Sequence, residues 1–185
     1  MDIRTQRIGH VTFIGSNETD TVAFYQGVLG MPLVLRQPNL DEPETLHLFF
    51  DAGGSSYLTF FVRADKVTDP TPVPWAVGSV HHVAMDLNQD AFDRALTGLG
   101  DARIPNSGRV DRGVFWSLYF RDPNGMLLEL SSWKVPVPPD MDKGAVLKRA
   151  QELREADGSY NATADHVRQA LEELRTKAVS GAGNV

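Results

Sequence analysis

Hydrophobic residues in the first part of the chain fall into short runs separated by polar turns. Residues 8–14 are rich in β-branched and aromatic side chains and predict a strand. Residues 17–29 carry apolar residues at helical spacing behind polar cap candidates, and Gly30 follows where such a helix would end. Three further strands are predicted, at residues 33–36, 46–50 and 57–62.

The same order of elements recurs in the next part of the chain. Residues 80–87 predict a strand and residues 88–99 a helix with one apolar face. Residues 113–120 and 126–130 predict two strands that are joined by the turn sequence Asp122-Pro-Asn-Gly125. This second series therefore repeats the first.

Short matching segments, roughly 70 residues apart, support an internal repeat. The matches are Gly9-His-Val with His81-His-Val, Leu29-Gly30 with Leu99-Gly100, and Leu58-Thr-Phe60 with Leu128-Glu-Leu130. We expect an α+β fold in which two βαβββ modules form a half-open mixed β-barrel around a metal site. The modules are predicted at residues 1–68 and 75–134, with a proline-rich linker between them.

A C-terminal helical extension, residues 135–185, lies outside the repeat. Prolines at 136, 138 and 139 interrupt the chain, and two amphipathic helices are then predicted at residues 142–156 and 162–178. Their apolar faces are expected to pack on the modules or on another subunit.

The composition narrows the range of functions. The net charge is -6 and the pI about 5.3, so no basic surface for nucleic acid is expected. There is no cysteine, which excludes a disulfide scaffold, a thiolate metal site and a cysteine nucleophile. Neither a signal peptide nor a membrane span is predicted, and the expected location is the cytoplasm.

A metal site is the most specific chemistry that the residues suggest. His10 and His82 occupy equivalent positions of the two repeats, so the two side chains should face the same way in their modules. Glu129 lies in an apolar strand, where a carboxylate is costly to bury without a partner such as a metal. Two histidines and one carboxylate are typical of non-haem iron(II) oxygenases. Structural hydrogen bonds and an ordinary salt bridge are the competing interpretations.

Several other polar residues remain open to two interpretations. Arg112 either binds an anionic oxygen or pairs with an aspartate, and Tyr119 either approaches Glu129 or is an ordinary sheet aromatic. His47 either supports a metal ligand or faces solvent, whereas His166 is expected on the surface of a helix. No serine-hydrolase elbow, P-loop or dinucleotide fingerprint occurs.

Residues 6–134 resemble the vicinal-oxygen-chelate superfamily of glyoxalases, bleomycin resistance proteins and extradiol dioxygenases. The resemblance rests on Phe24-Tyr-Gln-Gly-Val-Leu-Gly-Met31 and Tyr119-Phe-Arg-Asp-Pro-Asn-Gly125, followed by Leu128-Glu-Leu130. The stretch Asn39-Leu-Asp-Glu-Pro-Glu-Thr-Leu-His-Leu48 and the pair His81-His82 are similar to ring-cleaving dioxygenases that act on hydroquinones.

That resemblance implies that His10, His82 and Glu129 are metal ligands. It also implies that His81, Arg112 and Tyr119 bind substrate oxygens and move protons. Gly9 departs from these dioxygenases, which often have a histidine there. Glyoxalase I usually has a carboxylate at the position of Thr59, so a glyoxalase is a weaker match.

The expected activity is cleavage of a dihydroxylated aromatic ring, a hydroquinone or catechol, with O2 and iron(II). Manganese(II), nickel(II) and zinc(II) are alternative metals. A glyoxalase-like isomerase or lyase and a bleomycin-resistance-type binding protein are alternative functions. The partners expected are the aromatic substrate and O2, with no nucleic acid or membrane. The site lies within one chain or is shared across a homodimer.

Overall fold

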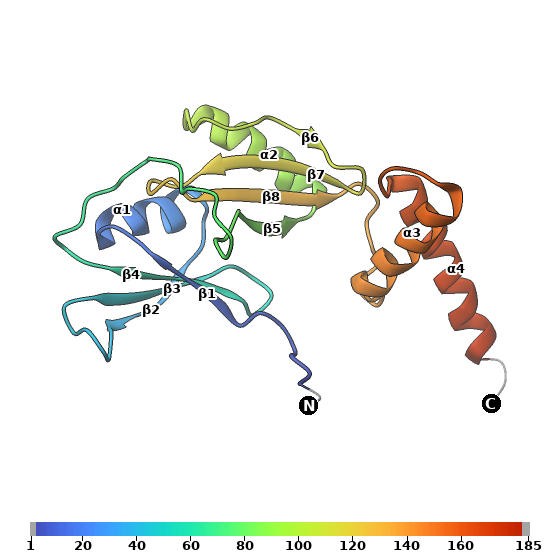
Figure 1. Cartoon of the computed structure of the whole chain (residues 1–185), viewed down its shortest axis with the longest axis horizontal. Coiled ribbons are helices and arrows are strands. Elements are labelled where there is room, and N and C mark those ends of the chain that lie inside the picture. The colour runs from blue at the N-terminus through green and yellow to red at the C-terminus, as the bar shows by residue number, and fades with distance from the viewer. Residues whose placement is uncertain (1–2, 183–185) are drawn as a thin grey trace. The chain divides into compact units, whose positions relative to one another are not determined.

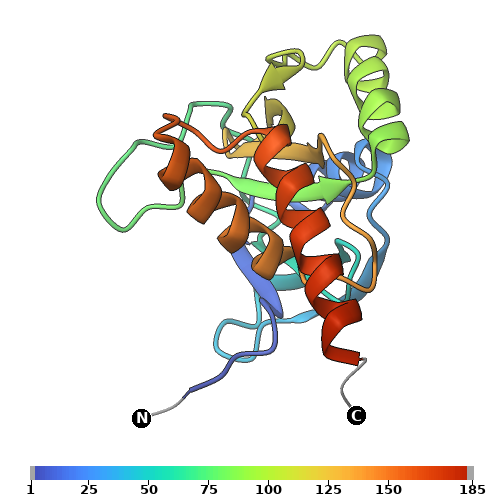
Figure 2. The ribbon, with the colours of Figure 1, turned by 90° about the vertical axis from the view of Figure 1, so that its right-hand side faces the viewer.

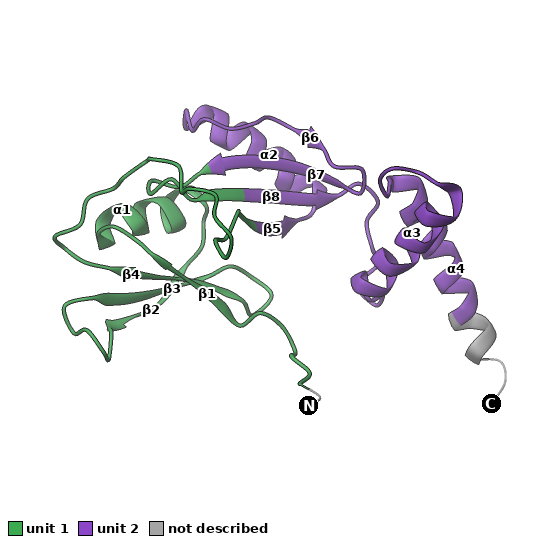
Figure 3. Ribbon diagram, viewed as in Figure 1, with its two compact units in different colours: residues 1–83, 121–128 green, residues 84–120, 129–185 purple. Residues whose placement is uncertain are grey.

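The computed structural model describes residues 3–182, with side chains as far as Lys177 in the last helix. Contacts divide the chain into two compact units (Figures 1 and 3). The first unit contains residues 1–83 together with 121–128, and the second contains residues 84–120 and 129–185. The module boundaries expected from the repeat remain a prediction.

A four-stranded mixed sheet forms most of the first unit. Its order is β1-β4-β3-β2, with β1 parallel to β4 and the remaining neighbours antiparallel. The strands are β1 (His10–Ile14), β2 (Leu33–Pro38), β3 (Leu46–Asp51) and β4 (Tyr57–Val62). Each strand predicted from the hydrophobic pattern of this part of the chain is present.

The helical segment between β1 and β2 changes its hydrogen-bonding pattern part-way. Helix α1 (Glu18–Val22) begins at Asn17, whose side chain accepts the backbone N–H of Asp20 at 2.9 Å. It continues as the π-helical segment η1 (Ala23–Val28), and its end is marked by a bond from the Leu29 amide to the Phe24 carbonyl. The segment buries aromatic rings against one face of the sheet.

The second module contributes a sheet of order β5-β8-β7-β6. Its strands are β5 (Val83–Leu87), β6 (Val110–Asp111), β7 (Phe115–Arg121) and β8 (Leu127–Trp133). Helix α2 (Gln89–Asp101) begins at Asn88 and buries Phe92 and Leu99. The two modules thus show the expected α+β elements, but the sheets are not closed into a barrel.

The turn between β7 and β8 belongs to the first unit, where it is held by a buried hydrogen bond. The Tyr25 hydroxyl donates to Asp122 Oδ2 at 2.9 Å, and both residues are buried. Burial raises the pKa of the Asp122 carboxyl, and burial beside this carboxyl raises the pKa of Tyr25. At Gly125, with φ of 75°, a Cβ atom would lie 2.0 Å from the Thr71 carbonyl oxygen. The turn therefore packs directly on the linker.

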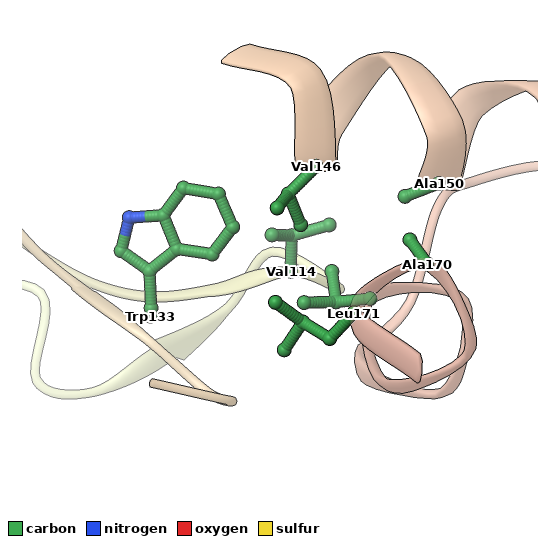
Figure 4. Packing of buried hydrophobic residues seen from close by; sticks show 7 residues of the cluster. Val114, Trp133, Val146, Ala150, Ala170 and Leu171 are labelled. Atoms are coloured by element: carbon green, nitrogen blue, oxygen red, sulfur yellow. The ribbon is translucent and has the colours of Figure 1, made fainter. Parts of the chain in front are cut away.

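Two helices complete the second unit (Figure 2). Helices α3 (Lys143–Asp157) and α4 (Ala164–Ala182) form a hairpin, and Gly158 ends α3 with φ of 74°. Their apolar faces enclose a core with the second sheet, which Figure 4 shows around Trp133. The members of this tail core are Val114, Trp133, Val146, Ala150, Val167, Ala170 and Leu171. The tail thus packs on its own chain.

The sequence suggested that His166 lies on the surface of its helix, but the structure buries it. It is 7% exposed, and its Nδ1 accepts the Thr163 amide while Nε2 lies 2.7 Å from an Asp157 oxygen. This histidine therefore joins the end of α3 to the start of α4. No helix within residues 3–182 is long and apolar enough to cross a membrane.

Candidate metal site and its surroundings

The first strand presents one polar and open face. His10, Thr12 and Ile14 are exposed, whereas Phe13 between them is 7% exposed and packs on the Phe60 ring. Because side chains alternate along a strand, His10 and Thr12 project from the side of the sheet opposite the helical segment. We call this side the His10 face.

Thr59 occupies the centre of the His10 face. It pairs with Thr12 across β1 and β4, and its hydroxyl lies 2.7 Å from the Thr12 hydroxyl. Thr59 is the counterpart of Glu129 in the internal repeat, and it is fully buried. The first sheet therefore has a satisfied pair of hydroxyls where the second sheet has a carboxylate.

His47 is a candidate whose role the sequence left open. It pairs with Phe61 across β3 and β4, which places it on the His10 face. Its ring lies 4.3 Å from the Phe49 ring and 4.5 Å from the Phe61 ring, and its Nε2 atom is buried without a hydrogen bond within the described residues. Burial lowers the pKa of His47, and the positive charge of His10 lowers it further.

The two adjacent histidines before β5 share a hydrogen bond. The Nδ1 atoms of His81 and His82 are 2.7 Å apart, so one ring donates and the other accepts. The Trp75 ring stands 4.5 Å from the ring of His81. A histidine that ligates a metal usually donates its second ring N–H to a neighbouring group, and the contact with His81 can give His82 that support.

Glu129 lies in the middle of β8 and is 7% exposed. Because side chains alternate along a strand, Glu129 lies on the same side of β8 as Trp133, which is four residues further along. The centres of the Phe115 and Trp133 rings are 4.9 Å apart, so these two residues lie on the same side of the sheet. Tyr119 is four residues after Phe115 in β7 and therefore also lies on that side. Glu129 and Tyr119 therefore project from one side of the second sheet, which we call the Glu129 face.

Arg112 is joined to Tyr119 rather than to an aspartate. Its Nε donates to the Tyr119 hydroxyl at 3.2 Å, and its guanidinium carbon lies 5.2 Å from the centre of the same ring. The tyrosine oxygen thus accepts a hydrogen bond from a cation. The sequence had left an aspartate partner open for this arginine.

The structure brings the predicted site residues together in part. It places His81 with His82 and Arg112 with Tyr119, but within residues 3–182 it forms no group of three side chains able to hold a metal ion. His10 and His82 belong to the first compact unit and Glu129 to the second. In chemistry, two imidazoles and one buried carboxylate suit a divalent transition metal.

A hollow of about 460 Å³, with both apolar and charged lining residues, opens at one end of the His10 face. Ile14 and Phe61 of the sheet line one wall, and residues 66–74 line the other. A hollow of this size and character suits the body of a small aromatic molecule.

The region that carries the fold and the candidate ligands matches a known protein superfamily. Residues 7–130, which include most of both modules and the three candidate ligands, match the model of the Glyoxalase/Bleomycin resistance protein/Dioxygenase superfamily. The chain belongs to this superfamily. Its C-terminal helices lie outside the matched region.

Individual relatives of this superfamily member carry two kinds of name. "Putative ring-cleaving dioxygenase MhqA" of Bacillus subtilis (strain 168) is 44% identical over 116 residues, 60% of this chain and 35% of that protein. "Putative ring-cleaving dioxygenase MhqO" of the same organism is 27% identical over 69% of this chain and 40% of that protein. "Metallothiol transferase FosB" of Shouchella clausii (strain KSM-K16) is 32% identical over 66% of this chain and 77% of that protein.

Solved structures agree with the family assignment. A crystal structure described as a "putative dioxygenase" from Bacillus subtilis subsp. subtilis str. 168 has 29% sequence identity and a TM-score of 0.59, over 70% of this chain and 41% of that one. This superfamily member spans 35% to 40% of the length of these two Bacillus relatives.

Proposed function

We propose that the protein is a metal-dependent ring-cleaving dioxygenase that acts on a dihydroxylated aromatic with O2. The observation that carries the proposal is the Glu129 face, where a buried carboxylate shares one side of the sheet with the Tyr119–Arg112 pair. The Bacillus relatives named as ring-cleaving dioxygenases support it. Placing its activity in the cytoplasm is part of the same proposal.

In this proposal His10, His82 and Glu129 hold the metal, with iron(II) favoured over manganese(II). When bound, the metal would bring the substrate oxygen and O2 to one centre. His81 fixes the ring of His82 through their shared hydrogen bond. Arg112 keeps the Tyr119 hydroxyl oriented, so that the tyrosine can donate its proton to a substrate oxygen.

The decisive experiment measures the metal content of protein purified without oxygen. We expect about one iron or manganese ion per chain in the wild type, and loss of that ion in His82→Ala and Glu129→Gln. Glu172→Gln is the matched control, since this exposed carboxylate lies on α4 in the helical extension. Oxygen uptake with hydroquinone and catechol would then follow ring cleavage.

Retention of the metal by Glu129→Gln would overturn the proposed ligand set. Nickel or zinc in the same place, with turnover in the absence of O2, would instead favour the second candidate, a metal-dependent transferase or isomerase. The long match to FosB, 77% of that protein, is the observation that favours this alternative. A protein that binds no added metal would be a ligand-binding protein of the bleomycin-resistance type.

A further inference from the structure

The helical extension is built into the rim of the Glu129 face. Trp133, on the same side of β8 as Glu129, is the residue on which the extension packs through Val146 and Leu171 (Figure 4). The extension therefore covers the Trp133 end of this face.

The loop between α3 and α4 reaches the segment that carries Arg112. A Cβ atom added at Gly113 would lie 2.3 Å from the Ala162 carbonyl oxygen, so the two backbones are in direct contact. Gly113 has φ of 77° and follows Arg112 immediately. The position of the arginine is thus tied to the position of the extension.

A hollow of about 580 Å³ lies between this segment and the extension. Arg112 and Phe115 line it from the sheet, and Gln151, Arg154 and Tyr160 line it from the helices. The hollow is within the size range of small-molecule sites. The Phe115 ring lies on its sheet side, and the exposed Tyr160 lies at its helix side.

Positive charge dominates the hollow in a chain of net charge -6. Its only acidic lining residue is Asp111, and Lys134 neutralises that carboxylate with contacts of 2.9 and 2.8 Å. Within the described residues the terminal guanidinium nitrogens of Arg112 have no acceptor, since only its Nε is engaged, by Tyr119. A carboxylate could accept two parallel hydrogen bonds from this guanidinium in a bidentate pair.

Arg154 is held in place by its own helix end. Its guanidinium donates to the Ser159 carbonyl at 2.9 Å and to the Gln151 side chain at 3.1 Å, with a longer contact of 3.4 Å to Glu155. The Arg154 cation is therefore fixed at the wall of the hollow and is paired with Glu155, so Arg112 is the lining cation without a carboxylate partner within the described residues.

We propose that this hollow binds a carboxylate carried by the substrate, so that the substrate is a dihydroxylated aromatic acid rather than a neutral hydroquinone. The inference rests on the proposed function, because it assigns the substrate class of the same site. The hydroxyls of such an acid would face Tyr119, while its carboxylate reaches Arg112 and Arg154.

The test compares two ligands that differ only in the carboxylate. Binding of 2,5-dihydroxybenzoate and of hydroquinone to the full chain is measured by calorimetry under argon, with and without added iron(II). A hydrogen bond to a charged group contributes enough that the acid should bind at least roughly tenfold more tightly than hydroquinone. Because binding is also measured without metal or turnover, its outcome is separate from that of the metal assay.

Two variants locate the carboxylate. Arg154→Gln should weaken binding of the acid roughly tenfold and leave hydroquinone binding unchanged. Gln151→Glu places a negative charge in the hollow while keeping an acceptor for Arg154. It should weaken binding of the acid and leave hydroquinone binding unchanged. Arg168→Gln, which removes an exposed cation elsewhere on the extension, is the charge-matched control.

Three results would overturn the proposal. They are equal binding of the two ligands by the wild type, unaltered acid binding in both variants, and binding of inorganic phosphate as tight as that of the aromatic acid. The last result would make the hollow a general anion site. Thermal unfolding of Arg154→Gln shows whether its effect on binding comes from the hollow or from loss of the helix end. If Arg154→Gln does not fold, acid binding by Gln151→Glu tests the proposal instead.

Discussion

Asp122 is a buried carboxyl whose hydrogen bonds do not fully offset its loss of hydration. Its Oδ1 accepts the amides of Asn124 and Met126 at 2.9 Å, and its Oδ2 accepts the Tyr25 hydroxyl. Its pKa is nonetheless raised, with burial as the largest cause. A raised carboxyl pKa means that the folded state binds the proton more strongly than the unfolded state does.

The stability that Asp122 contributes should therefore be full below the usual carboxyl pKa and should fall as pH rises through the raised value. Asp122→Asn keeps an acceptor for the two amides and removes this pH dependence. We expect the free energy of unfolding of the variant, relative to wild type, to rise between about pH 4 and about pH 7. Urea unfolding at the two pH values measures it, and a constant difference would contradict the prediction.

His81 supports a second prediction at the scale of a residue. If its ring orients His82, His81→Ala should lower metal affinity about 10–100-fold, because loss of the group that hydrogen-bonds a ligating histidine has an effect of this size. His81→Asn, which keeps an acceptor near the position of Nδ1, should retain most of the affinity. Competition with a coloured chelator gives the values, and equal affinity of wild type and His81→Ala would exclude the orienting role.

At the scale of elements, the close approach of the β7–β8 turn to the linker can be tested at Gly125. Gly125→Ala would force a Cβ atom into the Thr71 carbonyl at a backbone conformation that side chains rarely adopt. Gly53 has φ of 84° but open space around it, so Gly53→Ala carries the conformational cost alone. We expect Gly125→Ala to be about 1–3 kcal/mol more destabilising in urea unfolding. Equal effects would mean that the linker moves aside freely.

Hydrophobic periodicity was sufficient to predict most elements of this chain. The runs at 33–36, 46–50 and 57–62 became β2, β3 and β4, because alternating and β-branched positions fit a half-buried sheet. It could not predict η1, since one π-helical turn is too short to shift the apolar spacing of a helix detectably, although its hydrogen bonds span one residue more. The two-residue strand β6 is too short to give a periodic signal.

The candidate site was predictable only where the repeat or a motif marked it. Repeat symmetry marked His10 and His82 as candidate ligands, and the motif resemblance pointed to Arg112 and Tyr119; these assignments stay predictions. The sequence gave no sign that Arg112 donates a hydrogen bond to Tyr119, because that contact depends on the path of an irregular loop. His47 has no counterpart in the second repeat, so only strand register places it on the His10 face.

At the scale of the molecule, the helical extension distinguishes this chain from the region shared with its superfamily. Trp133 is 8% exposed at the centre of the tail core. Trp133→Ala should destabilise the fold by about 3–5 kcal/mol, as loss of a large buried ring does. Trp75, which is 79% exposed, provides the control, and Trp75→Ala should change stability by less than about 0.5 kcal/mol.

Thermal and urea unfolding would follow both tryptophan variants. Equal effects of Trp133→Ala and Trp75→Ala would mean that the extension contributes little to the stability of the sheet. A selective loss in Trp133→Ala, accompanied by weaker binding of the aromatic acid, would connect the extension to the site as well as to the fold.

The place of residues 121–128 in the first unit has a consequence for synthesis on the ribosome. Tyr25 is made early, but the carboxylate that accepts its hydroxyl emerges only after the whole of α2 and β7. A nascent chain that has reached residue 83 therefore holds every strand of its first sheet and still lacks the buried partner of Tyr25. Completion of the first half of the protein must wait for the second, so translation and folding of the two halves are interlocked rather than successive.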